Sequence, residues 1–364
     1  MEKILKDSRE IFGDLPVPPP SLSDNSNPSQ AKWMSRFPDD MPITQLNIPG
    51  THDSATWDYS QETQNRLLRS TSHCSDEARP HPAAQYRCQR QSLASSLEAG
   101  IRFFDLRIAM DPLQGDLTFW HAEALLSTRT RLEDVLFGFY TWLSARPSET
   151  VLLSLMYEHG GNDSESTAAS QRLLFNILTS DAARQYISQR HGDLGTLGDS
   201  RGKIILFRRF DLDLLAPSYD AALPGIHLSP KVWVENGPDF ALTYNVTTGA
   251  TALIEDYYYP VEETPFLKDI VNAKFAAVRN HLDRAAKGDT NELFITFTSA
   301  TRPDVAVYPE MIALGSKSER VSGVNERLVD YFQRDTKVVK RRRGIVITDF
   351  YEQFGDLVEL VIGS

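Results

Sequence analysis

Residues 101–108 read IRFFDLRI, and this stretch decides the fold. Its apolar and aromatic residues predict a buried β-strand, and two charged residues, Asp105 and Arg107, stand near its end. Because side chains alternate along a strand, Asp105 and Arg107 point to the same face. A buried strand with such a pair at its carboxyl end is typical of strands that support an active site.

Seven further runs of apolar, β-branched or aromatic residues have the same character: 43–48, 117–120, 151–156, 203–207, 251–254, 293–298 and 344–348. Several are separated by stretches with the apolar period of amphipathic helices: 130–144, 166–189, 267–286 and 324–334. Strands that alternate with helices indicate a parallel sheet. The sequence therefore predicts an α/β fold, a distorted (β/α)8 TIM-type barrel made irregular by residues 211–249. An open doubly wound sheet is the alternative.

Each run ends in, or is directly followed by, side chains that can bind or react. In chain order they are Thr51-His52-Asp53, Asp105 with Arg107, His121, Glu158, Arg208-Arg209, Glu255 to Tyr258, Thr298-Ser299 and Asp349. Barrel enzymes build their active sites from the carboxyl ends of the strands, so a closed barrel brings all these positions to one rim.

Two histidines at such a rim, His52 and His121, can serve as base and acid, because an imidazole with a pKa near 6.5 populates both protonation states at neutral pH. Asp53 and Asp349 could each hold an imidazole in the needed tautomer. The guanidinium of Arg107 suits a phosphate, since its fork pairs with two oxygens. Taken singly, these residues have structural interpretations as capping histidines or ion pairs. Their joint placement favours a catalytic site exposed at the rim.

The composition narrows the class of protein. The chain has 364 residues, 41% of them hydrophobic and 24% charged, which excludes a disordered or collagen-like chain. Lys and Arg total 38 against 49 Asp and Glu, a net charge of −11. This balance predicts no nucleic-acid partner and no bulk attraction to anionic membranes.

The chain is predicted to divide into a Pro- and Ser-rich, partly extended arm at residues 1–35 and one barrel domain at 36–364. No run is long enough to span a membrane, and the charged start lacks the apolar core of a signal peptide. If Met1 is the native start, an intracellular protein is expected; a trimmed sequence leaves export open. Cys74 and Cys88 can form one disulfide at most and predict no zinc site.

Three motifs stand out: LNIPGTHDS at 46–54, QSL at 91–93 together with GIRFFDLR at 100–107, and His121. They resemble the X domain of phosphatidylinositol-specific phospholipase C, as found in bacterial single-domain enzymes and their fungal relatives. Shorter matches at 147–151, 201–206 and 348–349 extend the resemblance from about residue 40 to the C-terminus. The resemblance implies a distorted (β/α)8 barrel.

It also implies a mechanism. His52 resembles the general base that deprotonates the inositol 2-hydroxyl, whose oxygen attacks the adjacent phosphorus. His121 resembles the general acid that protonates the departing diacylglycerol oxygen. Asp349 resembles the partner of His52, and Asp53 the partner of His121. The implied first product is a cyclic inositol phosphodiester.

Further roles follow from the same resemblance. Arg107 with Asp105 would stabilise charge on the phosphoryl oxygens. Three residues match positions that contact the inositol ring: Arg209, Asp256 and Tyr258. Two residues of the fourth run, 151–156, and its end share one face of the predicted strand and would bind the substrate with them: Met156 and Glu158.

Position 107 decides the cofactor question. Metal-dependent members of the family have an aspartate there that helps to bind Ca2+, whereas this chain has a permanent cation. A hard dication needs several oxygen ligands, which Asp53 and Asp105 alone do not supply. The resemblance therefore implies an enzyme without metal or other cofactor.

Met156 departs from the family, whose bacterial members have a lysine that faces the inositol. A thioether cannot donate a hydrogen bond to a sugar hydroxyl, so headgroup recognition is expected to differ. The expected partners are a phosphoinositide or related lipid headgroup and, transiently, a membrane surface, with the protein a monomer. Two alternatives stay open. One is a barrel phosphodiesterase of the glycerophosphodiester or sphingolipid type, and the other is a catalytically weak binding protein.

Overall fold

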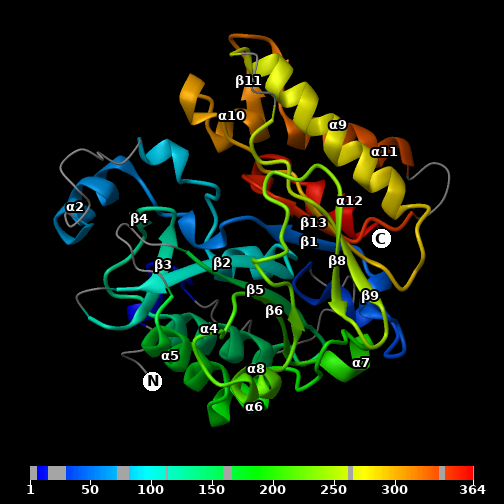
Figure 1. The fold of residues 1–364 in the computed structure, drawn as a ribbon. Coiled ribbons are helices and arrows are strands. Elements are labelled where there is room, and N and C mark those ends of the chain that lie inside the picture. The colour runs from blue at the N-terminus through cyan, green and yellow to red at the C-terminus, as the bar shows by residue number, and fades with distance from the viewer. Residues whose placement is uncertain are drawn as a thin grey trace, which may run out of the picture.

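The computed structural model describes residues 6–14, 30–71, 82–111, 114–158, 166–260, 265–335 and 341–363 (Figure 1). Its centre is a sheet with the strand order β7-β6-β5-β2-β1-β13-β10-β9-β8, from which β3 and β4 branch off at β2. The part of the chain described contains no helix that is both long and apolar enough to cross a membrane.

Eight strands of this sheet run parallel: β1 (Ile48–Thr51), β2 (Phe103–Met110), β5 (Val151–Tyr157), β6 (Ile204–Arg209), β7 (Ile226–His227), β9 (Ala250–Glu255), β10 (Leu293–Phe297) and β13 (Ile345–Thr348). A ninth, β8 (Phe240–Asn245), pairs antiparallel with β9. The path ends at β7 and β8, so among the described strands the barrel is open between these two. This is the order of a distorted (β/α)8 barrel.

The predicted run 117–120 is not a barrel strand. It forms β3 (Leu117–His121), which pairs antiparallel with β2 and continues into β4 (Ala124–Leu125). Parallel neighbours need a crossover of a dozen or more residues, and the link from β2 to β3 is far shorter. The eighth parallel strand is instead the two-residue β7, inside the segment 211–249.

The run 43–48 enters the sheet later than predicted. Residues Ile43–Gln45 form the 3-10 helix η2, and β1 begins only at Ile48. Ile43 is buried there, so the apolar pattern at this point reflects packing on the core rather than a strand.

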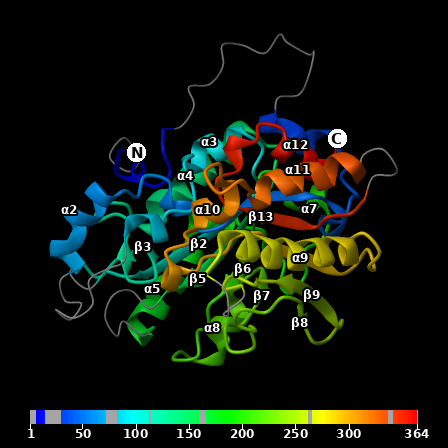
Figure 2. The same cartoon turned by 90° about the horizontal axis from the view of Figure 1, so that it is seen from above.

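The predicted helical stretches are present as α4 (Leu132–Ala145), α5 (Ala168–Leu178) with α6 (Asp181–Tyr186), α9 (Leu267–Ala285) and α11 (Val324–Asp335). The stretch 166–189 divides because the Ser180 hydroxyl accepts a hydrogen bond from the amide of Ala183 and starts a new helix. Other α-helices of the described residues are α2 (Gln61–Thr71), α3 (Leu93–Glu98), α7 (Leu197–Ser200), α8 (Pro217–Ala222), α10 (Pro309–Leu314) and α12 (Leu357–Ile362). Helices α9 and α11 lie side by side (Figure 2).

Both ends of the predicted arm pack on the barrel. Ile11 and Phe12 are buried, and the Phe12 ring contacts that of Phe139 edge to face at 5.2 Å. Trp33, in the 3-10 helix η1 (Gln30–Arg36), is buried and donates a hydrogen bond to the carbonyl of Gly100. The Pro-rich segment 15–29 lies outside the described residues, as does Cys74. The division into arm and barrel stays a prediction.

Candidate active site

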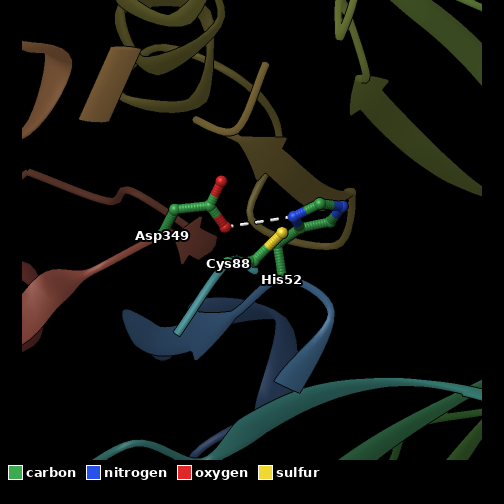
Figure 3. A group of neighbouring side chains, drawn as sticks. All are labelled: His52, Cys88 and Asp349. Atoms are coloured by element: carbon green, nitrogen blue, oxygen red, sulfur yellow. Dashed lines mark hydrogen bonds and ion pairs between the residues drawn. The ribbon is translucent and has the colours of Figure 1, made fainter. Parts of the chain in front are cut away.

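The pairing of β1 with β13 builds the first half of the site. Thr51 and Thr348 are partners in register, so the next residues, His52 and Asp349, leave the sheet side by side. His52 Nδ1 lies 3.0 Å from Asp349 Oδ1, although the residues are 297 positions apart (Figure 3). Asp349 is buried, and this burial raises the pKa of its carboxyl group, although His52 beside it acts in the opposite direction.

The neighbouring strand, β2, fixes the tautomer of His52. Arg107 Nη2 lies 2.8 Å from His52 Nε2. A guanidinium only donates hydrogen bonds, so Nε2 must be the acceptor and the ring proton resides on Nδ1, where it is donated to Asp349. His52 therefore presents a lone pair on Nε2, which is the state required of a general base.

His121, at the end of β3, forms the second half. Its Nδ1 lies 2.8 Å from the carbonyl oxygen of Tyr86, which accepts a hydrogen bond, and 2.9 Å from Asp53 Oδ2 in an ionic contact. Burial would lower the pKa of His121, but the Asp53 carboxylate outweighs it and raises that pKa. The rings of His52 and His121 are 6.2 Å apart. The pair thus consists of a base in its neutral form and a histidine stabilised in its protonated form.

Arg107 is held by three carboxylates. Its Nε lies 3.4 Å from Asp53 Oδ2 and 3.3 Å from Asp105 Oδ2, and its Nη1 lies 3.1 Å from Glu158 Oε1. Burial alone would raise the pKa of Asp53, but Arg107 and His121 lower it to about 2. Asp105 also contacts Arg209 at 3.3 Å. Burial opposes its ionisation, yet the two guanidinium groups lower its pKa.

These side chains surround a cavity of about 280 Å³. Its lining includes eight of the predicted site residues: His52, Arg107, His121, Met156, Glu158, Arg209, Asp256 and Tyr258. The other three, Asp53, Asp105 and Asp349, are buried and contact the lining residues from behind. The structure thus brings together all eleven residues named from the sequence.

The lining residues Arg209, Asp256 and Tyr258 have aromatic and polar partners. The Arg209 guanidinium stacks 4.0 Å from the ring centre of Trp233, whose Nε1 donates a hydrogen bond to Asp256 Oδ2 at 2.8 Å. The Tyr258 hydroxyl donates to Glu235 Oε2 at 3.1 Å. Stacked rings beside fixed carboxylates are suited to a hydroxylated ring such as a sugar or a cyclitol.

Met156 lies between the two arginines of the site. In the sheet register it is opposite Arg107 on β2 and Arg209 on β6, and its side chain lines the cavity. Met156 therefore lies on the cavity wall, where the sequence placed it.

Comparison with known proteins shows what the chain is similar to. Residues 80–210 match the family model of the phosphatidylinositol-specific phospholipase C X domain. Over 314 residues the chain is 27% identical to the 1-phosphatidylinositol phosphodiesterase of Listeria monocytogenes, covering 84% of this chain and 82% of that protein. The matched segment is thus similar to the phosphatidylinositol-specific phospholipase C X domain, and the similarity to this relative extends over most of both chains. A 1-phosphatidylinositol phosphodiesterase of Staphylococcus aureus is 23% identical over 350 residues, covering 94% of this chain and 96% of the relative.

Solved structures of the family share the fold. A mutant of phosphatidylinositol-specific phospholipase C from Staphylococcus aureus superposes with a TM-score of 0.66 at 21% identity, over 92% of this chain and 97% of that one. The enzyme from Listeria monocytogenes gives 0.63 at 22%, over 92% and 98%. These likenesses confirm the predicted α/β barrel. The X-domain match itself contains Arg107 and His121, whereas His52 and Asp349 lie outside it.

The site also contains residues that the sequence did not reveal. The buried Gln89 donates hydrogen bonds from its side-chain amide to the carbonyls of His52 and Thr348, at 2.8 and 2.9 Å, and so links the ends of β1 and β13. Tyr86 holds His121 through its carbonyl, and Glu235 lines the cavity. None of these residues ends a predicted strand, so no pattern marked them.

Backbone strain occurs directly beside three candidate residues of this site. Six described non-glycine residues have positive φ, and three of them are Asp53, Ala122 and Phe350. The first follows His52, the second follows His121 and the third follows Asp349. Left-handed backbone is unfavourable for residues with a Cβ and persists where surrounding structure holds it, often at functional sites.

A larger cavity, of about 720 Å³, lies beside α10 and the hairpin of β11 (Gly315–Ser316) and β12 (Val321–Ser322). Its lining contains charged residues such as Glu310 and Arg320 but no histidine or cysteine. Cavity size alone therefore does not locate the site. The smaller cavity is the one that combines acid, base and guanidinium.

Proposed function

We propose that this protein cleaves the phosphodiester bond of phosphatidylinositol-type lipids by acid–base catalysis, through a cyclic inositol phosphate and with release of diacylglycerol. The observation that carries the proposal is that His52 and His121 line one cavity together with Arg107, with their rings 6.2 Å apart. The names of the Listeria and Staphylococcus relatives support the same substrate class.

His52 is the proposed base. Its Nδ1 proton is engaged by Asp349, which leaves Nε2 to take the proton of the inositol 2-hydroxyl. In the substrate-free site Arg107 donates to this same nitrogen. The guanidinium of Arg107 forms a stronger hydrogen bond with a charged phosphate than with a neutral imidazole. Binding of the phosphodiester therefore draws Arg107 away from His52 and frees Nε2.

His121 is the proposed acid. Asp53 stabilises its imidazolium form, which then protonates the diacylglycerol oxygen as the bond to phosphorus breaks. Arg107 meanwhile offsets the negative charge that develops on the phosphoryl oxygens. The cyclic phosphodiester can afterwards be slowly hydrolysed by water.

The same geometry disfavours a metal-dependent barrel phosphodiesterase. Three carboxylates of the site, Asp53, Asp105 and Glu158, contact the guanidinium of Arg107. A divalent cation would need these oxygens as ligands while a permanent cation stands among them. We therefore propose a reaction without metal.

The proposed substrate implies transient contact with a lipid surface. Val232 and Val234 are 60% and 47% exposed, and they flank Trp233, which packs against Arg209 at the cavity. Apolar side chains at this place can enter the outer part of a bilayer while the headgroup enters the cavity. That the protein works as a monomer stays a prediction.

Asp53→Asn tests the assignment of the acid. Asp53 raises the pKa of His121, so its removal lets burial and the charge of Arg107 lower that pKa. In the variant, His121 then loses its proton at a lower pH than in the wild type. The alkaline limb of the pH profile of kcat should therefore move to lower pH. The profile is measured beside that of the wild type. An alkaline limb that stays in place would contradict the pairing of Asp53 with the acid.

Met156→Lys tests headgroup recognition. A lysine between β2 and β6 restores a donor to the inositol, and one hydrogen bond contributes roughly 0.5–1.5 kcal/mol. Activity on phosphatidylinositol should rise by up to about tenfold, whereas Met156→Leu, which adds no donor, should change it little. If Met156→Lys lowers activity on every inositol lipid, the cavity is fitted to another headgroup.

The function itself is tested by comparing two kinds of vesicle. Phosphatidylinositol vesicles should release diacylglycerol, whereas phosphatidylcholine vesicles, whose headgroup has no hydroxyl beside the phosphate, should not. Equal release from both would contradict the proposal, and so would release from neither.

A further inference from the structure

Cys88 occupies a central position that the proposed mechanism does not use. It is fully buried, and its thiol sulfur, a ring nitrogen of His52 and a carboxylate oxygen of Asp349 lie within 4.8 Å of one another. The side chain is turned toward the His52 ring, beside the hydrogen bond to Asp349 (Figure 3). The same thiol forms a second such group with Asp53 and His121.

The surroundings hold Cys88 in place and leave acceptors available. Its amide donates to Thr56 Oγ1 at 3.0 Å, and its carbonyl accepts from the amide of Phe350 at 3.1 Å. The thiol itself makes only a long contact, 3.7 Å, with the carbonyl of Tyr86 among the described residues. Asp349 Oδ2 is buried and accepts no hydrogen bond from the part of the chain described.

A thiolate, an imidazole and a carboxylate form a donor set that zinc and chemically similar soft divalent cations prefer. Calcium and magnesium prefer oxygen ligands alone, so the sulfur disfavours them. Tetrahedral coordination with bonds of about 2.0–2.3 Å brings ligand atoms to about 3–4 Å from one another, a small closure from the present spacing. We infer that Cys88, His52 and Asp349 form an inhibitory site for Zn2+, with water as the fourth ligand.

Inhibition follows from the tautomer of His52. The zinc ion takes Nδ1, so the single proton of the neutral ring moves to Nε2, and the lone pair that the base requires is lost. The thiol proton of Cys88 is released to solvent. Because the thiol must lose its proton to bind the metal, zinc binding should tighten as pH rises. The inhibitory half of this inference rests on the proposed function, whereas binding of the metal does not.

The first measurement is inhibition. Enzyme freed of metal with EDTA and dialysed is assayed on phosphatidylinositol vesicles against increasing free Zn2+. Cys88→Ser and Cys88→Ala should keep the basal activity and raise the zinc concentration for half inhibition at least about tenfold, since even outer partners of metal ligands contribute about 10- to 100-fold to affinity. Cys74→Ser, which alters the only other cysteine in the sequence, is the matched control and should behave like the wild type.

The second measurement is binding without turnover. Cd2+ should give the ultraviolet charge-transfer band of a cadmium–thiolate bond in the wild type, in Cys74→Ser and in His121→Asn. The band should disappear in both Cys88 variants and weaken in His52→Asn. A band that depends on Cys74, or on His121 but not on His52, would overturn the ligand set.

The two proposals fail in different ways. An enzyme inactive on inositol lipids that still shows the Cys88-dependent band contradicts the proposed function and leaves the metal site standing. An active enzyme that zinc inhibits equally in the wild type and in both Cys88 variants overturns the site, as does an active enzyme without the band.

Discussion

Replacing either histidine should reduce turnover on phosphatidylinositol by about 10²–10⁴-fold, because each variant lacks one of the two proton transfers. The sequence predicts exposed rim residues whose loss leaves stability unchanged. In the structure the side chains of His52 and His121 are only 13% and 16% exposed, and each contacts a buried carboxylate. Alanine would remove the imidazole that contacts Asp349 or Asp53 and should also cost about 1–3 kcal/mol of stability. His52→Asn and His121→Asn, which keep a donor, are the better variants.

The two variants should differ in one respect. A substrate with a good leaving group no longer needs an acid, so it should partly restore turnover to His121→Asn and not to His52→Asn. Melting temperatures measured alongside separate loss of chemistry from loss of folding. Near-wild-type turnover in either variant, or equal rescue of both, would contradict the assignment of base and acid.

Arg107→Lys should lower turnover by about 10²–10³-fold, the usual effect of removing a donor that stabilises developing charge. The guanidinium bonds to His52 and Glu158 through its two terminal nitrogens while its Nε faces Asp53 and Asp105. A lysine ammonium is a point charge and cannot span these partners.

The wild-type enzyme should remain fully active after exhaustive chelation, because Arg107 supplies the charge that a metal ion would otherwise provide. The assay compares EDTA-treated enzyme with the same sample after addition of Ca2+. Loss of activity in EDTA that Ca2+ restores would show that the reaction depends on a metal and would revive the metal-dependent alternative.

The strands could be predicted where they were long and apolar. Run 101–108 became β2, but the two-residue β7 is too short to produce a pattern. The run before His121 shows a different difficulty, since apolar character does not distinguish a barrel strand from a hairpin arm. His121 nevertheless reaches the rim, because β3 folds back antiparallel on β2 and ends beside Asp53.

The reacting side chains of the site could be predicted from the sequence, whereas the residues that hold them in place could not. Strand ends in a parallel barrel share one rim, so His52 and Asp349 could be placed at one site from the sequence. Their pairing across 297 positions was predicted from the family resemblance alone. Gln89 and Cys88 come from a segment without helical or strand periodicity, and their contacts depend on the path of that loop. Nothing in local sequence encodes that path, so these residues emerged only from the structure.

The central claim is that the inositol 2-hydroxyl attacks the phosphorus. Phosphorus NMR during cleavage of phosphatidylinositol vesicles tests it most directly, with a lipid that lacks this hydroxyl as the control. The cyclic inositol phosphate should be the first product and should precede any monoester, and the control lipid should remain intact. A phosphomonoester that forms from the start without the cyclic species, or cleavage of the control lipid, would contradict the mechanism.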